Sequence, residues 1–325
     1  GRIEQLHSLN AFALYRMLLV PRAWRLTRTM ASRVFVNQAV ESVLAKTLEA
    51  GKLQGKHDVR FSLKSQARKS REYVCQYNES HFDFMSRWME REGVYYFFNH
   101  QDQTDQMVVT DTRMVHQDCP LVHEMLYQPT TGMERSEAER LITSLSVKQT
   151  PMPEKVTLRD YNYQRPDVEM KVQETVDPEG FGEVFCYGDH FLDLAEGNGL
   201  AKVRAEELLA SKRVLQGKSA SPFLRSGYLF TIQGHYRKDV DEKRFLCVDI
   251  QHEGGQEGYL EQALGVRLRH REQINGYRNS FTAIPAETPY RPPRNTPWPR
   301  IHGTMNARIH AEGGGQYAEV DSQGR

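Results

Sequence analysis

The sequence contains few cysteines, and their spacing fits no shared site. Cys75, Cys119, Cys186 and Cys247 lie more than forty residues apart in a chain of 325 residues. That spacing is typical neither of a disulfide framework nor of a zinc site built on a Cys-x-x-Cys pair. We expect buried free thiols, which suits folding in a reducing cytoplasm.

A long apolar run is also missing. The most apolar stretch, Ala11 to Val20, is short, contains Arg16 and is followed by Pro21. A membrane helix needs roughly 20 consecutive apolar residues. The sequence likewise shows no basic, apolar and small-residue regions in the order of a secretory signal. If the protein leaves the cell, we expect it to do so without a signal peptide visible here.

The chain carries almost no net charge. Lys and Arg number 43 against 42 Asp and Glu, for a formal net charge of +1, so nothing global indicates a nucleic-acid binder. The balance hides an asymmetry, because residues 1–72 hold 14 basic and 5 acidic residues, and the remainder holds 29 and 37. A basic front and an acidic back could meet head to tail between subunits. Two solvated surfaces of unlike charge explain the pattern equally well.

Residues 71–100 give the strongest local prediction. Ser80 followed by Asp83 forms a capping-box pattern at the start of a helix, and Gly93 follows its last turn. Residues 94–98 are β-branched or aromatic, as in a buried strand. The helix should bury one apolar face, made of Phe84, Met85, Trp88 and Met89.

The rest of the N-terminal part predicts shorter elements. Residues 1–4 and 12–20 are strand-like, and Asn37 is predicted to cap a helix that runs through Leu48. A strand is expected at Met107–Thr110. The apolar face of the helix is formed by Val40, Val43, Leu44 and Leu48.

Beyond a polar, turn-rich boundary at residues 128–139, the sequence favours strands. A helix is predicted from Gly199 to Gln216, with Ala201, Ala205, Leu208 and Leu209 on one stripe. Residues 227–236 and 244–252 alternate with period two around a polar turn, which predicts a hairpin. Further strands are expected at residues 145–147, 155–158, 182–187 and 264–269.

A proline-rich segment follows. Six prolines lie between Ile284 and Pro299, which makes this segment stiff, extended and poor in backbone donors. We interpret it as an interdomain connector. Residues 300–302 and 307–310 are expected to start another β domain.

Possible metal and phosphate sites are weak. His235 and His252 could face each other across the hairpin, but a third ligand is not identifiable, so structural histidines are the better interpretation. His310 and Glu312 lack the cysteine pair of a deaminase, and Gly313 begins a glycine run without the context of a phosphate loop. The acidic residues near His100 are interpreted as turn residues: Asp102, Asp105 and Asp111.

One basic and aromatic cluster surrounds Trp24. A single-stranded nucleic-acid groove needs that mixture, and so does a solvated strand face with one core tryptophan. We favour the second interpretation. The basic members are Arg16, Arg22, Arg25, Arg28 and Arg33. No G-x-S-x-G elbow or catalytic Cys/His phrase is present, so no catalytic, cofactor or metal residue is predicted.

Several stretches match one family in fixed register. The first runs from Gln76-Tyr77 through Glu79-Ser80, Asp83-Phe84, Arg87, Glu90, Glu92-Gly93, Tyr96 and Phe98 to His100. The others include Tyr15 to Phe35, Gly197 to Glu207, Gly227 to His235 with His252, Tyr277 to Pro292 with Gly303, and Asp321 with Gly324-Arg325. Together they resemble the VgrG family, the spike-tip proteins of type VI secretion, which are related to contractile phage tail hubs.

This resemblance implies an α+β, β-rich hub. It predicts a remnant of a first β-barrel at residues 1–30, an α/β insertion at 31–127, and a second β-barrel with one long helix at 128–284. A connector at 285–299 and the incomplete start of an oligonucleotide/oligosaccharide-binding-type barrel at 300–325 follow. Family members usually extend beyond both ends, into further barrel strands and a β-helical needle. Core residues are expected in two modules: Phe84, Trp88, Tyr96 and Phe98, and then Leu208, Phe230 and Val248.

The family's function is mechanical. The resemblance implies a homotrimer that sits on a hexameric Hcp-like tube protein, contacts baseplate components, carries effector proteins and passes transiently through a target membrane. It implies assembly in the bacterial cytoplasm and then secretion or injection, with no cofactor and no nucleic acid. A hub of a contractile phage tail remains an alternative, and a β-rich secreted hydrolase is a weaker one.

Overall fold

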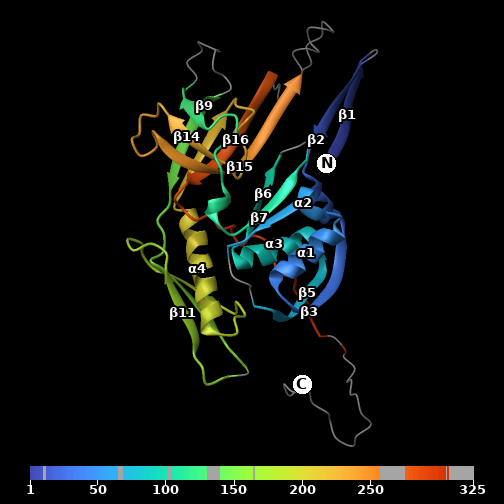
Figure 1. Cartoon of the computed structure of the whole chain (residues 1–325), viewed down its shortest axis with the longest axis vertical. Coiled ribbons are helices and arrows are strands. Elements are labelled where there is room, and N and C mark those ends of the chain that lie inside the picture. The colour runs from blue at the N-terminus through green and yellow to red at the C-terminus, as the bar shows by residue number, and fades with distance from the viewer. Residues whose placement is uncertain are drawn as a thin grey trace, which may run out of the picture.

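The computed structural model describes residues 1–9, 12–64, 69–100, 104–129, 140–163, 165–256, 275–304 and 306. In these residues, a closed barrel and two smaller α/β modules are arranged around helices α3 and α4 (Figure 1). The β-rich, hub-like fold class is thereby confirmed. The domain boundaries stay a prediction, and most of residues 300–325, like the strand expected at 264–269, lie outside the described residues.

The barrel forms where the sequence alternates between polar and apolar residues. Its strands close in the order β13-β16-β15-β14-β8-β9. The predicted hairpin is confirmed, because β14 and β15 pair antiparallel. Phe230, Phe245 and Phe281 fill the interior as rings with centroids about 6 Å apart. The strands are β8 (Glu124–Tyr127), β9 (Leu141–Gln149), β13 (Arg213–Ser219), β14 (Leu229–Gln233), β15 (Lys243–Gln256) and β16 (Asn275–Pro285).

The α3 module, named after its central helix, occupies residues 22–115. Helix α3 (His81–Glu92) and helix α1 (Val40–Ala50) pack against strands β3 (Met30–Gln38) and β5 (Arg71–Ser80). A second sheet has the order β4-β7-β6 and comprises β4 (Val59–Ser62), β7 (Gln106–Thr110) and β6 (Tyr95–Asn99). Short helices complete the module: η1 (Arg22–Arg28), α2 (Gly55–Asp58) and η2 (Arg113–Val115).

The α4 module lies between two barrel strands in the sequence. Helix α4 (Leu194–Ala210) covers one face of a sheet with the order β11-β10-β12 (Figure 1). The strands are β10 (Lys155–Asp160), β11 (Met170–Thr175) and β12 (Glu183–Tyr187). Strand β11 is an element that the sequence patterns did not predict.

The chain begins with a hairpin of its own. Strands β1 (Arg2–Leu9) and β2 (Phe12–Leu18) pair antiparallel with each other, as a two-stranded sheet. Ile3 is 73% exposed, and Tyr15 and Met17 are also exposed. An isolated hairpin buries little apolar area, so its own contribution to stability is small.

Three predicted helix boundaries were wrong. Asn37 does not cap α1, because β3 continues to Gln38 and the N-cap is Ala39, without a side-chain hydrogen bond. Helix α4 begins and ends earlier than predicted. Asp193 caps it by accepting a hydrogen bond from the Glu196 backbone, and the chain after Ala210 turns into barrel strand β13.

Three core predictions also need correction. Leu208 does not share a core with Phe230: it packs in the α4 module, while Phe230 lies in the barrel. Val248 is only half-buried, because a register shift between Cys247 and Asp249 interrupts the pairing of β15 with β16. In the α3 module, Phe84 and Trp88 are buried as predicted, while Tyr96 and Phe98 are half-buried against the same cluster.

The basic cluster around Trp24 lies mainly on a short helix and not on one strand face. Residues 22–28 form the 3₁₀ helix η1, and Leu26 is its fully buried residue. Trp24 is 37% exposed, with the Arg28 guanidinium 5.4 Å from its ring centroid. The prediction of a core tryptophan here was therefore wrong. The four cysteines are free, with Cys119 and Cys247 buried and the other two half-buried.

Candidate functional site

The ends of helix α3 are fixed as the sequence predicted. The Ser80 hydroxyl accepts a hydrogen bond from the Asp83 backbone at 3.0 Å and donates one to the Asp83 carboxylate at 2.7 Å. Gly93 ends the helix with a φ of +67°, where a side chain would also collide with Val203 of α4. The glycine therefore permits both the turn and the close approach of α4.

A buried ion pair joins α3 to β5. Arg87 is 1% exposed, and its Nε and Nη2 donate to the two carboxylate oxygens of Glu79 at 2.9 and 2.7 Å. The same Nη2 donates to the Cys75 carbonyl at 2.6 Å. Such a paired and hydrogen-bonded arrangement is what lets a guanidinium be buried.

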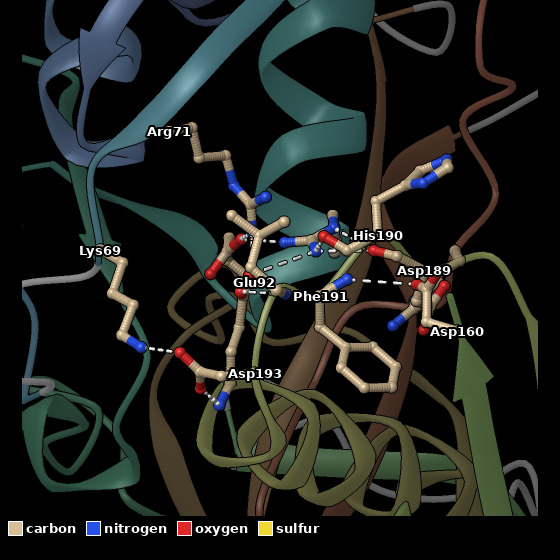
Figure 2. Close-up of polar contacts among 12 residues, drawn as sticks. Lys69, Arg71, Glu92, Asp160, Asp189, His190, Phe191 and Asp193 are labelled. Carbon is tan, nitrogen blue, oxygen red and sulfur yellow. Dashed lines mark hydrogen bonds and ion pairs between the residues drawn. The ribbon is translucent and has the colours of Figure 1, made fainter. Parts of the chain in front are cut away.

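A charge network joins the C-terminal end of α3 to the start of α4 (Figure 2). Arg91 is buried, bonds Glu92 at 2.5 Å and donates to the Asp189 carbonyl at 2.7 Å. Arg71 of β5 pairs with Glu92 and with Glu196 of α4. Desolvation lowers the pKa of Arg91, and Glu92 counters that shift. Residues from three elements thus hold the α3 and α4 modules together.

The cap of α4 belongs to the same network. The Asp193 carboxylate accepts from the Glu196 backbone at 2.9 Å and pairs with Lys69 (Figure 2). The hydrogen bond from Lys69 lowers the pKa of Asp193. Behind it, Phe191 is buried, and its backbone N–H donates to Asp160 at 3.2 Å.

The connector is fastened across both modules. Arg291 pairs with Glu206 of α4 at 2.7 Å and donates to the carbonyls of Gly93 and Asp111, each at 2.7 Å. Arg294 forms an ion pair with Asp189 at 2.9 Å. We call these contacts, together with those of Thr296 and Trp298, the connector clamp.

Thr296 and Trp298, at the C-terminal end of the connector clamp, contact helix α3. Thr296 donates its backbone N–H and its hydroxyl to the Glu90 carboxylate, at 3.0 and 2.6 Å. The Arg87 guanidinium lies 4.4 Å from the ring centroid of Trp298. Three residues that carry the family resemblance, Arg87, Glu90 and Gly93, therefore contact the connector or α4.

The barrel is joined to the α3 module through His116. Its Nδ1 donates to the Gly227 carbonyl at 2.8 Å, and its Nε2 accepts from the Tyr95 hydroxyl at 2.9 Å. Burial lowers the pKa of His116 and raises that of Tyr95. The neutral imidazole is thus a structural link between the two modules.

The weighed metal candidates do not come together. His235 is buried and stacks on Tyr236 with ring centroids 4.4 Å apart, whereas the His252 ring is hydrogen-bonded to the Tyr277 hydroxyl. Asp105 lies between β6 and β7 and accepts a 2.6 Å ion-pair hydrogen bond from Arg22. Asp111 contacts the Lys64 backbone, while Asp102 and residues 310–315 lie outside the described residues.

Nothing in the described part of the chain groups three or more His, Cys, Asp or Glu residues as a metal site would. The described helices also include none with the length and apolarity to cross a membrane. What the arrangement provides is mechanical: charge pairs fix the α3 module, the α4 module and the connector to one another, and the neutral His116 links the barrel to the α3 module. Sequence reasoning found the α3 residues and placed Arg291 in the connector, but it missed the contacts of Arg71, Arg91, Arg291 and Arg294, each of which has a partner distant in sequence.

Comparison with known proteins gives one consistent picture. The profile of the family "Phage tail baseplate hub (GPD)" matches residues 1–258. The type VI secretion system spike protein VgrG1b of Pseudomonas aeruginosa is 29% identical over 301 residues, which are 92% of this chain and 39% of VgrG1b. The actin cross-linking toxin VgrG1 of Vibrio cholerae is 26% identical over 320 residues, covering 91% of this chain and 26% of the toxin. The chain thus spans less than half the length of these relatives.

Solved structures share the fold. The E. coli c3393 protein, described as a type VI secretion component similar to the T4 tail proteins gp27 and gp5, aligns with a TM-score of 0.62 at 20% identity. That alignment covers 96% of this chain and 69% of c3393. The 43 kDa tail protein of prophage MuSo2 from Shewanella oneidensis aligns with a TM-score of 0.54 at 9% identity, covering 82% and 72%.

Proposed function

Because this chain belongs to the phage tail baseplate hub family, and within it to the VgrG proteins, we propose that it forms the hub part of a type VI secretion spike. The family match over residues 1–258 supports the hub role, and the spike-protein relatives favour secretion over a phage tail. The observation that carries the proposal is the connector clamp, which ties the segment leading out of the hub to two modules at once. A hub that transmits a push from tube to tip needs such a rigid attachment.

The partners follow from this role. Three chains would form a ring whose paired barrels present a pseudo-sixfold face to a hexameric tube protein, by repeating a related interface. Baseplate components and effector proteins would bind elsewhere. Assembly would take place in the bacterial cytoplasm, followed by secretion or injection without a signal peptide. Residues 1–325 would act without catalysis, although one relative is named as a toxin.

The test is native mass, measured by light scattering on a size-exclusion column over a range of concentrations, with a hexameric tube protein added in a second run. A particle of three chains that co-elutes with the tube supports the hub. The proposal is contradicted if the chain stays monomeric after extension at both ends and does not bind the tube protein. A hub of a contractile phage tail would give the same mass but would prefer a phage tube protein.

A further inference from the structure

A cavity of about 410 Å³ lies where α3 and β6, barrel strand β15 and the connector meet. Its volume is in the range of small-ligand sites. Six phenylalanine and tyrosine residues are among those that line it: Phe82, Tyr95, Tyr96, Phe97, Phe98 and Tyr290. We call it the aromatic cavity.

The charged side chains that line the aromatic cavity are all acidic, and the nearby Arg291 guanidinium is paired with Glu206 outside the lining. Glu90 and Asp249 line the cavity, and among the described lining residues there is no lysine or arginine. His116 also lines it, but its neutral ring is already bonded through both nitrogens. Glu90 accepts two hydrogen bonds from Thr296, at 3.0 and 2.6 Å. Asp249 is exposed, and no described side chain is hydrogen-bonded to its carboxylate.

The rings and the carboxylates lie close together. Tyr95 and Tyr290 meet edge to face at 5.0 Å, and Tyr96 meets Phe98 at 5.7 Å. The pKa of Tyr290 is raised by burial and then by Asp249, Tyr96 and Glu90, so these groups share one electrostatic environment. Aromatic faces carry negative potential, as the two carboxylates do, so the surroundings attract a cation with an apolar body.

We propose that the aromatic cavity binds an alkylguanidinium cation, either free or as the arginine side chain of a partner protein. A guanidinium is planar, stacks on aromatic rings, bonds carboxylates through a fork of donors and is more weakly hydrated than an ammonium. The site does not depend on the hub role, since it rests on the cavity lining alone.

The experiment is calorimetric titration of the full chain with n-butylguanidinium and with n-butylurea, which is nearly the same shape but neutral. We expect the cation to bind at least about fivefold more tightly, which corresponds to ~1 kcal/mol. Asp249→Asn and Tyr290→Leu should each weaken cation binding about threefold to tenfold, with n-butylurea unaffected by the first change. Matched controls on exposed residues outside the cavity, Asp167→Asn and Tyr187→Leu, should change nothing.

A second arm separates the two sources of the cation. The capped tripeptide Gly-Arg-Gly is compared with Gly-Gln-Gly. Binding of both n-butylguanidinium and the arginine peptide assigns an arginine side chain, whereas binding of n-butylguanidinium alone assigns a free cation. Equal binding of n-butylguanidinium and n-butylurea overturns the proposal, and so does an Asp249→Asn variant with unchanged affinity. Because Asp249 is exposed, that variant should keep its fold even if Tyr290→Leu does not.

Discussion

Trp298 of the connector lies against Trp88 of α3, with ring centroids 5.3 Å apart and planes inclined by 64°. The Arg87 guanidinium lies against both rings, 4.4 Å from the centroid of Trp298 and 5.8 Å from that of Trp88. Trp88 is 6% exposed and Trp298 is 46% exposed. The connector therefore packs against α3 through this cluster.

The first prediction compares the three tryptophans. Trp88→Ala should lower the free energy of unfolding by about 3–5 kcal/mol, because it leaves a cavity in the α3 core. Trp298→Ala should cost about 1–2 kcal/mol, from one aromatic pair and one cation–π contact. Urea denaturation monitored by circular dichroism measures the free energy of unfolding of both variants. Trp24→Ala is the matched control and should cost less than about 1 kcal/mol, since Trp24 packs on the surface; equal costs at all three positions would contradict this packing.

The second prediction concerns the buried pair of Glu79 and Arg87. Arg87→Met alone should destabilise the protein by about 3–5 kcal/mol, because the Glu79 carboxylate then stays buried without its cation. The double variant Glu79→Gln with Arg87→Met should lose less than the sum of the single variants, which a double-mutant cycle measures. Additive losses would show that the two side chains act independently.

The third prediction tests the connector clamp. Arg291→Ala removes an ion pair with Glu206 and two hydrogen bonds to carbonyls, so unfolding should become easier by about 2–4 kcal/mol. Limited proteolysis should also cut the variant within residues 285–299 before it cuts elsewhere. Arg159→Ala, at an exposed position of β10, is the control and should behave as the unchanged protein. Resistance of the connector in the Arg291 variant would mean that the proline-rich segment is rigid on its own.

Helix α3 could be predicted because its information is local. The start of the helix is indicated by Ser80 and Asp83 and its end by Gly93, and its apolar residues repeat with the helical period. The barrel hairpin was predictable for the same reason, since β14 and β15 are neighbours along the chain.

The contacts that join the connector to the α3 and α4 modules could not be predicted from local patterns. Arg291 donates to Gly93 across 198 residues, and no spacing rule links the two. The predicted C-terminal end of α4 was wrong because the residues that continue the helical pattern pair with the barrel instead: β13 joins β9 and β16. Tertiary contacts override local propensity in this way wherever a segment has a sheet to complete.

The last prediction is that the protein loses stability in mild acid, because three buried histidines resist protonation in the folded state. The pKa values of His81, His116 and His235 are lowered from 6.5, each mainly by burial. His81 Nδ1 faces two donors, Arg33 Nη2 at 3.3 Å and Gln76 Nε2 at 3.1 Å, so it must accept and stay unprotonated.

The sign of the effect follows from proton counts. Below about pH 6.5 the unfolded chain binds protons at these histidines that the folded chain does not, so the free energy of unfolding should fall as the pH drops from 7.5 to 5. Urea midpoints measured across that range test this fall. His116→Gln should reduce its slope, and His57→Gln, an exposed histidine in α2, should leave it unchanged. A midpoint that stays constant down to pH 5 would mean that these imidazoles accept protons in the folded state, and that the neutral link between His116, Tyr95 and Gly227 is wrong.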